Sequence, residues 1–386
     1  MKIPITYNIR NLIVRRVTAL MTAAGIALTV AVLLAVLALV SGLRSAFAAT
    51  GNRLNVLVLR KGSTTELGSA MTREMFQDLL FKPGIAQING RPLASLEMVT
   101  VVRLPVPDNP RGMSVTVRAL LPAGITLRNV RLLGGRWFEA GRREVVVGKN
   151  IARRSPDAKL GGAIHFGRQS WQVVGIMDGG RSAINDEIFG DLNQISSDAN
   201  RTERLSSVLV RAADAAAVPA LIESFNNDQR LNAFAQTETD YYMRQTAAGD
   251  PLRTLGIFVS VIMAIGSGFA AMNTMYAAVS RRTREIGTLR VLGFSRGSIL
   301  ASFMMESVLL AAAGGILACL LILPLNNLST AVGNSVSMSE VAVNFRVTPA
   351  ILAAGLAYAA LLGLLGGFLP ARMAAKKEIL TALREV

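Results

Sequence analysis

The sequence has 386 residues with one cysteine, one histidine and only 5% aromatic residues. A single cysteine, Cys319, excludes an internal disulfide. A single histidine, His165, excludes a catalytic or metal site built from several histidines. Charged residues make up 17% of the chain, against about 25% in soluble domains, and the mean hydropathy is +0.42. The composition therefore argues against a purely soluble protein, and a disordered chain is excluded because 51% hydrophobic residues can bury a core.

Four apolar runs are long enough to span a bilayer, which takes about 20 residues in a helix. The runs cover 19–40, 255–279, 299–323 and 349–369, and Glu306 is the one charged residue within them. The spans are predicted at 18–42, 252–279, 298–323 and 349–370. Ala46-Phe47-Ala48 resembles a signal-peptide cleavage site. However, the first run exceeds the roughly 7–15 apolar residues of a signal peptide, so we interpret it as an uncleaved signal anchor.

Lysine and arginine gather at one set of span ends. They precede the first span, occupy the loop between the second and third spans, and follow Pro370. Because such residues mark the cytoplasmic side, we predict that both termini are cytoplasmic. The expected segments are an amphipathic helix at 1–17, a cytoplasmic loop at 280–297, a short periplasmic loop at 324–348 and a cytoplasmic tail at 371–386. The net charge of +16 is then mainly a topology signal, and nucleic acid is not an expected partner.

Residues 43–251 have the composition of a water-exposed domain, which would lie outside the cytoplasm between the first and second spans. Alternating patterns predict strands, and helices are expected at 72–80, with Thr72 as N-cap, and at 214–225, with Asp214 as N-cap. The predicted strands lie at 54–60, 95–104, 114–121, 144–148, 163–166, 171–176 and 206–210. The predicted fold class is therefore membrane α-helical, with four transmembrane helices plus an α+β extracytoplasmic domain.

No arrangement of residues in this domain indicates catalysis. We interpret His165 as structural and Trp137 and Trp171 as anchors of the core. No serine–lysine, serine–histidine–aspartate or metal-binding pattern stands out. The sequence therefore predicts no catalytic, cofactor-binding or metal-binding residue on this chain.

The segment 280–300, SRRTREIGTLRVLGFSRGSIL, is predicted to form a short basic helix. Ile286, Leu289 and Gly293 would share one face of it at helical spacing. The basic residues fit either a topology signal or a docking element for a cytoplasmic partner. Composition alone leaves both interpretations open.

The pattern R-x-R-E-I-G-x-L-R-x-L-G from Arg282 to Gly293 resembles the signature of ABC transporter permeases of the MacB, LolC/LolE and FtsX kind. Glu306 with Leu309 and Gly314-Gly315 resembles the third span of that family, and Pro370-Ala371-Arg372 with Ala382-Leu383-Arg384 resembles its ending. Gly134–Phe138 and residues 144–148 resemble its periplasmic core. The resemblance extends over essentially the whole chain.

The resemblance implies that this loop forms a coupling helix against a cytoplasmic ABC ATPase subunit. The residues expected to couple are Arg281, Arg282, Arg284, Glu285, Ile286, Gly287, Leu289, Arg290 and Gly293. The chain lacks a G-x-x-x-x-G-K-[ST] loop. ATP and Mg²⁺ are therefore expected on a separate ATPase, and this chain is not expected to be an enzyme. A second permease copy or a sister permease would complete a dimer in membrane lipid, and attachment of a periplasmic adaptor or lipoprotein stays open.

The expected function is that of an inner-membrane permease subunit that couples ATP hydrolysis to motion of its periplasmic domain. The cargo to be exported or extracted would be a lipid, lipoprotein, peptide or amphipathic drug. One alternative is an FtsX-like regulator that activates periplasmic cell-wall hydrolases without transport. Another is a membrane-anchored sensor or enzyme that has no ATPase partner.

Two features inside the spans call for close packing or pairing. Glu306 is costly to bury alone in hydrocarbon, so it is expected either to reach back to the basic cluster or cap a neighbouring helix, or to serve a proton or substrate. Small residues recur every four positions in the first and fourth spans and predict close helix contacts. In the fourth span these are Gly355, Ala359, Gly363 and Gly367, and in the first Ala23, Ala27, Ala31 and Ala35. Spacing does not decide whether the contacts lie within the chain or across a dimer.

Overall fold

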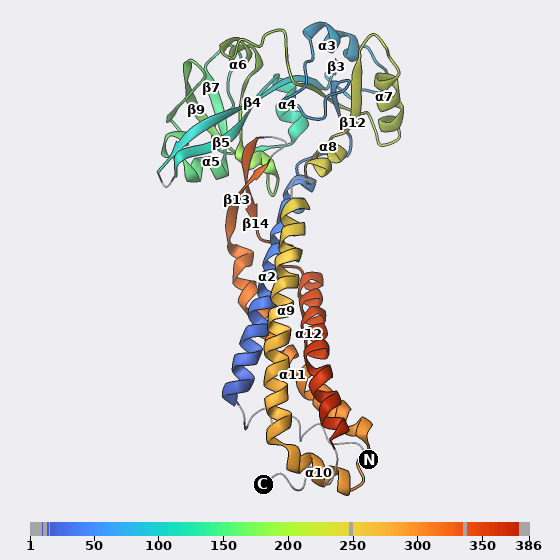
Figure 1. Ribbon diagram of the computed structural model, residues 1–386. Coiled ribbons are helices and arrows are strands. Elements are labelled where there is room, and N and C mark those ends of the chain that lie inside the picture. Colours follow the sequence, from blue (N-terminus) through green and yellow to red (C-terminus); the bar gives the residue numbers. More distant parts are fainter. Residues whose placement is uncertain are drawn as a thin grey trace. The chain divides into compact units, whose positions relative to one another are not determined.

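The computed structural model describes residues 10, 14, 16–107, 109–246, 250–334 and 338–377. The chain forms two compact units (Figure 1). The first comprises Met1–Ser41, Asp250–Leu328 and Asn344–Val386, and the second comprises Gly42–Gly249 and Ser329–Val343. Most of the predicted amphipathic helix at 1–17 and residues 378–386 of the predicted tail lie outside the described residues.

Among the described residues, four helices are long and apolar enough to cross a membrane, and they lie in the first unit except for the last residues of the first of them (Figure 1). These are α2 (Arg16–Ala48), α9 (Asp250–Arg281), α11 (Arg296–Ile322) and α12 (Pro349–Lys376), and the short helix α10 (Thr283–Val291) follows α9. The predicted four-helix architecture, with a large domain between the first two spans, is therefore confirmed.

Helices α2 and α12 run well past their predicted ends. Helix α2 continues beyond residue 42 to Ala48, because Leu43 and Phe47 bury their side chains in the second unit. Helix α12 includes Pro370 and continues to Lys376, although proline removes a helical hydrogen bond. Its last turns are retained by packing, since Ala371 and Ala374 are fully buried.

The predicted short loop at 324–348 contains secondary structure that was not predicted from the sequence. A 3-10 turn, η4 (Leu323–Asn327), is followed by the paired strands β13 (Ser329–Asn334) and β14 (Ser339–Asn344). Most of this hairpin belongs to the second unit. Alternation explains its burial, because Val341 and Val343 point to the same side of β14 and both are buried.

The second unit is built on a ten-stranded mixed sheet with the order β12-β1-β11-β4-β5-β10-β7-β9-β6, and β8 pairs with β9. Most neighbours are antiparallel, whereas β10 runs parallel to β5 and β7 runs parallel to β9. The strands are β1 (Asn55–Arg60), β4 (Ala94–Val106), β5 (Asn109–Leu120), β6 (Arg131–Gly135), β7 (Glu144–Gly148), β8 (Ala163–Phe166), β9 (Gln169–Asp178), β10 (Glu187–Asp191), β11 (Ser207–Arg211) and β12 (Ala233–Thr237). A separate short pair consists of β2 (Gln87–Ile88) and β3 (Arg91–Pro92).

Helices and strands mix along this unit, in agreement with the predicted α+β class. The helices are α3 (Arg73–Leu80), α4 (Pro122–Arg128), α5 (Lys149–Arg154), α6 (Leu192–Asp198), α7 (Ala217–Asn226) and α8 (Glu238–Gln245), with 3-10 turns η1 (Pro156–Ala158) and η2 (Ala183–Asp186). Thr72 caps α3 as predicted, since its side chain accepts the N–H of Met75. Helix α7 begins later than predicted, although Asp214 does accept the N–H of Ala217.

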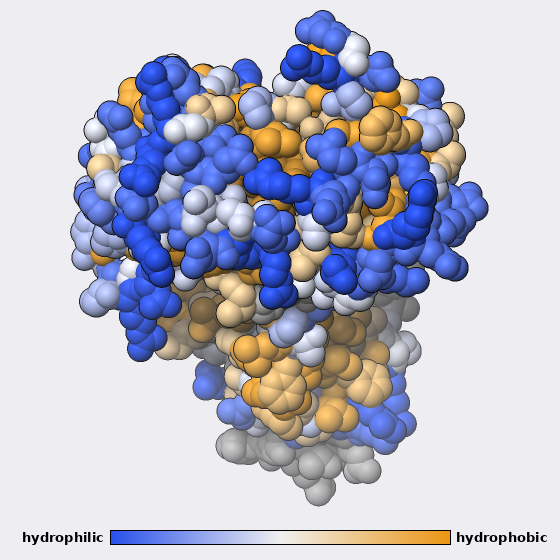
Figure 2. Space-filling view, turned by 90° about the horizontal axis from the view of Figure 1, so that it is seen from above, coloured by the Kyte–Doolittle hydropathy of each residue, from blue (hydrophilic) through white to orange (hydrophobic). Residues whose placement is uncertain are grey.

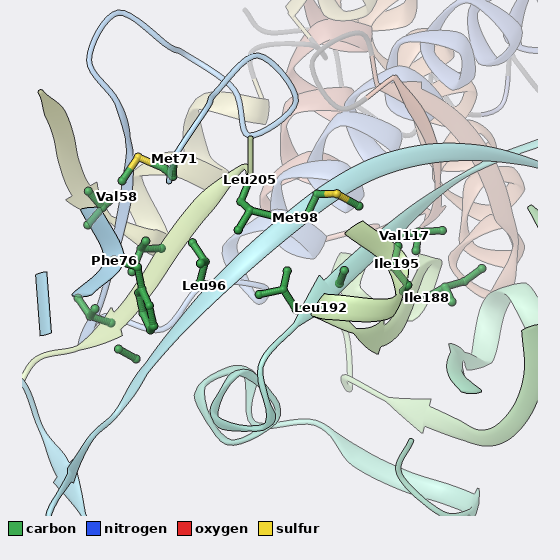
Figure 3. Close-up of a cluster of buried hydrophobic side chains, with 14 of the residues drawn as sticks. Val58, Met71, Phe76, Leu96, Met98, Val117, Ile188, Leu192, Ile195 and Leu205 are labelled. Atoms are coloured by element: carbon green, nitrogen blue, oxygen red, sulfur yellow. The ribbon is translucent and has the colours of Figure 1, made fainter. Parts of the chain in front are cut away.

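Successive residues of the strands serve opposite faces of the sheet. On one face of the sheet, Ile188 of β10 belongs to the larger hydrophobic cluster, which also contains residues of α3, α5, α6 and α7 (Figure 3). On the other side, the adjacent Phe189 joins a smaller cluster. Trp171 is fully buried in the larger cluster, whereas Trp137 packs half-buried against the smaller one. Figure 2 shows a mostly hydrophilic surface on the second unit, as expected for a domain in water.

Candidate functional site

The helix α10 is set apart from its neighbours by local sequence signals at both ends. Arg282 leaves the helical conformation at the junction with α9. At the other end, Gly293 has φ +91°, a left-handed conformation that glycine adopts easily. The N–H of Phe294 donates to the carbonyl of Leu289 and that of Gly293 to Arg290, so the helix closes in a Schellman motif. Gly293, expected at the coupling surface, thus has a defined role in ending α10.

The two faces of α10 differ sharply. Thr283, Ile286 and Gly287 are buried, and Ile286 packs among apolar residues from the adjacent ends of α9, α11 and α12. The opposite face is exposed and combines basic and apolar side chains. Its exposed residues are Arg284, Glu285, Thr288 and Val291, and together with Arg281 at the end of α9 and Leu292 directly after α10 we call them the outer face.

The structure divides the predicted coupling residues between the packed and the exposed face of α10. Arg282, Ile286 and Gly287 are buried in the bundle and hold α10 in place, because the helix needs one face for its own packing. Leu289 and Arg290 are half-buried. Val291 and Leu292 are not in the predicted set, and they are 62% and 63% exposed. The signal that could have found them was an apolar pair just before the terminating glycine, off the face that contains Ile286.

Glu306 of α11 has a charged partner inside the first unit. Its Oε2 lies 2.8 Å from Nη1 of Arg282, and both side chains are only 5% exposed. The guanidinium carbon of Arg282 also lies 5.9 Å from the centre of the Phe303 ring, within cation–π range. In the structure the carboxylate of Glu306 therefore reaches back to the basic cluster, which is one of the expected arrangements.

The small residues of the fourth span pack within the chain. A Cβ on Gly355 would lie 2.7 Å from the Leu34 side chain of α2, and one on Gly363 would lie 2.6 Å from Cβ of Ala311 in α11. Ala359 is fully buried. A Cβ on Gly367 would overlap the side chain of Ser307 in α11. This ridge therefore lets α12 approach α11 and α2 closely.

A buried charge network in the second unit was not foreseen. Arg118 of β5 binds the carboxylates of Glu66, Glu97 and Glu187 at 2.7, 2.9 and 2.8 Å. Arg128 then joins Glu97 to Glu238, at 2.6 and 3.2 Å. Because the participants come from segments far apart in the sequence, no spacing rule could reveal them.

Burial and pairing act against each other in this network. Burial by itself would raise the pKa of Glu66, but the charge of Arg118 and its hydrogen bonds outweigh it, so the pKa of Glu66 lies below its usual value. At Glu238 burial dominates and raises the pKa despite Arg128. The network therefore fixes the domain interior and offers no free acid or base. Over the part of the chain that is described, no group of His, Cys, Asp and Glu side chains could hold a metal ion.

Four helices able to cross a membrane, a large domain inserted after the first of them and a two-faced helix between the second and third form the architecture of a membrane permease. Residues 19–227, more than half of the chain, match the MacB-like periplasmic core domain, and residues 257–379 match the FtsX-like permease C-terminal family. The chain belongs to the family of ABC transporter permeases that carry a MacB-like periplasmic core domain. The family implies an ATPase partner and dimeric assembly.

Relatives with export or permease names extend over much of the chain. The ABC transporter permease YknZ of Bacillus subtilis is 26% identical over 70% of this chain and 70% of its own length. The macrolide export ATP-binding/permease protein MacB of Campylobacter jejuni is 26% identical over 97% of this chain and 60% of its own length. The pyoverdine export ATP-binding/permease protein PvdT of Pseudomonas fluorescens is 28% identical over 65% and 39%. The chain thus spans less than two thirds of the length of both export proteins.

Solved structures show weaker likeness. The extracellular domain of the noncanonic ABC-type transporter YknZ from Gram-positive bacteria matches with a TM-score of 0.37 and 16% identity, covering 47% of this chain and all of that domain. The periplasmic region of MacB from Actinobacillus actinomycetemcomitans matches with a TM-score of 0.38 and 13% identity, covering 52% and 94%.

Proposed function

We propose that this chain is the membrane subunit of an ATP-driven exporter and that the outer face of α10 docks on a separate cytoplasmic ATPase. The observation that carries the proposal is the division of α10 into a packed face and an exposed face. Val291 and Leu292 would fill an apolar groove on the partner, because large exposed hydrophobic residues mark interaction sites. Arg281 and Arg284 would pair with carboxylates at its rim.

The proposed mechanism is mechanical transmission, with cytoplasmic termini and a periplasmic second unit. ATP closes a pair of ATPase subunits, α10 moves with them, and α9 and α11 pass the motion on. The spans support this mechanism, because Glu306, the charge in their apolar runs, is already paired with Arg282. The proposed mechanism therefore needs no polar pathway for cargo through the four spans of one protomer.

The proposed cargo is an amphipathic molecule taken up outside the cytoplasm. Two relatives are named for the export of macrolides and of pyoverdine, which supports a small amphipathic cargo over a purely regulatory role. Regulation of cell-wall hydrolases is not favoured, because the large external unit matches the MacB-like core domain.

The docking face can be tested by reversing its chemistry. We expect Arg284→Glu combined with Leu292→Asp to abolish co-purification of the ATPase from the native host and the ATPase activity of the purified complex. Both side chains are exposed, so folding should persist. Arg372→Glu, at an exposed position of α12, is the control and should retain the complex. An ATPase that still binds the double variant in full would refute docking through this face.

A further inference from the structure

Three charged side chains form a continuous chain of contacts from the outer face of α10 to the third span. Glu285 is 57% exposed on α10, and its Oε2 lies 3.8 Å from Nε of Arg282. Arg282 in turn is 2.8 Å from Glu306, and both of these side chains are buried. A single guanidinium therefore connects the partner-facing surface to α11.

The surroundings of Arg282 make its bond to Glu306 strong and directional. Ile286, Ile299 and Phe303 belong to the buried apolar cluster at this end of the first unit. Ion pairs interact more strongly away from water, and a guanidinium bonds carboxylates in a fixed planar geometry. Glu306 lies about three turns into α11, so the contact is made to the body of the span and not to its frayed end.

Stability alone does not explain the pair. Replacing a buried ion pair by apolar residues of similar volume is often neutral or stabilising, because desolvation offsets the attraction. Ile286 already anchors α10 through apolar contacts, and such contacts allow sliding that a fixed ion pair does not. The pair therefore adds orientation, which matters where a helix must transmit movement.

We propose that Arg282 is a positioning residue: its bond to Glu306 makes α10 and the third span move as one body. The inference rests on the proposed docking of α10 to an ATPase and goes beyond it by naming the joint. The ATPase contacts the outer face, and Arg282, directly behind Glu285, carries the displacement to Glu306. The first turn of α11 then follows the nucleotide state.

The test follows α11 in the full chain bound to its ATPase. Cys319→Ser removes the only thiol, and Gly297→Cys places one at an exposed position in the first turn of α11. A maleimide dye reports the labelling rate with and without ATP and vanadate. With Arg282 and Glu306 intact we expect the labelling rate with ATP and vanadate to differ clearly from the rate without nucleotide.

The informative variant replaces both partners, Arg282→Met with Glu306→Met. We expect the ATPase to co-purify as before, because neither side chain is on the outer face, while the nucleotide-dependent change in labelling is lost. The reversed pair, Arg282→Glu with Glu306→Arg, should restore part of the change. Arg372→Met makes the same substitution at an exposed position and should retain it. A purely structural pair would leave the apolar variant fully responsive.

The outcomes separate this inference from the proposed function. If no ATPase binds the chain with Arg282 and Glu306 intact, the proposed function fails. If the ATPase binds but the labelling rate does not depend on nucleotide, the proposed coupling through Arg282 and Glu306 is wrong. It is also wrong if the double methionine variant keeps the full nucleotide-dependent change. If the Arg282→Met, Glu306→Met variant does not fold, Arg282→Lys replaces it in the test, because lysine keeps the positive charge but lacks the planar guanidinium. An undiminished response in that variant would also overturn the proposal.

Discussion

Asp186 is expected to make the second unit less stable as the pH rises. Its side chain is buried, and Oδ2 accepts a hydrogen bond from Asn150. Burial raises the pKa of Asp186 to about 7, against the opposing effects of Asn150, the backbone N–H of Ala342 and the charge of Arg154, while Glu187 adds to the rise. The folded protein therefore holds a proton that the unfolded chain has already released.

The size of the effect follows from proton linkage. Between pH 4 and 7 the folded state binds more protons at Asp186 than the unfolded state, so the free energy of unfolding falls as pH rises. With about 1.4 kcal/mol for each pKa unit, a pKa near 7 makes the unit about 2–3 kcal/mol less stable at pH 8 than at pH 5. Asp186→Asn removes this dependence and should stabilise the unit at pH 8.

The assay uses the two tryptophans, Trp137 and Trp171, because both lie in the second unit. Their fluorescence reports its unfolding in the full chain in detergent, at pH 5 and pH 8. Asp178→Asn is the matched control: hydrogen bonding to Lys149 lowers the pKa of Asp178, so its stabilisation is already complete above pH 5. That variant should lose stability equally at both pH values. An unchanged pH slope in Asp186→Asn would show that Asp186 is ionised in the folded state and refute the reasoning.

Two further predictions concern the buried ion pairs of Arg118 and the close packing of α12. Arg118→Met leaves three buried carboxylates without their cation and should cost roughly 3–5 kcal/mol in the tryptophan assay. Arg230→Met, at an 86% exposed side chain, should cost far less, because water screens its ion pair with Asp228. Gly363→Val forces a Cβ against Ala311 and should cost about 1–3 kcal/mol, measured by the reaction of Cys319 with a thiol-reactive dye on heating. Gly266→Ala, with open space around the added carbon, should be nearly neutral; equal losses in both glycine variants would contradict the close packing of α12.

The candidate site was only partly predictable. The signature from Arg282 to Gly293 located the helix between the second and third spans, because its residues are contiguous. It did not separate the packed face from the exposed one. Arg282, Arg284 and Ile286 all belong to the same family signature, yet Arg282 and Ile286 are buried whereas Arg284 is exposed. Side-chain direction depends on where α9, α11 and α12 lie around α10.

By itself the sequence determined the membrane architecture. Long uncharged runs must form helices in lipid, where each backbone group needs an internal partner, and these runs are local features. Alternating patterns likewise determined many strands of the second unit. The tertiary structure alone decided which distant residues meet. It paired Arg282 with Glu306, enclosed Arg118 among carboxylates from separate segments and placed the β13–β14 hairpin in the second unit. These contacts join residues far apart along the chain, and no periodicity in the sequence records them.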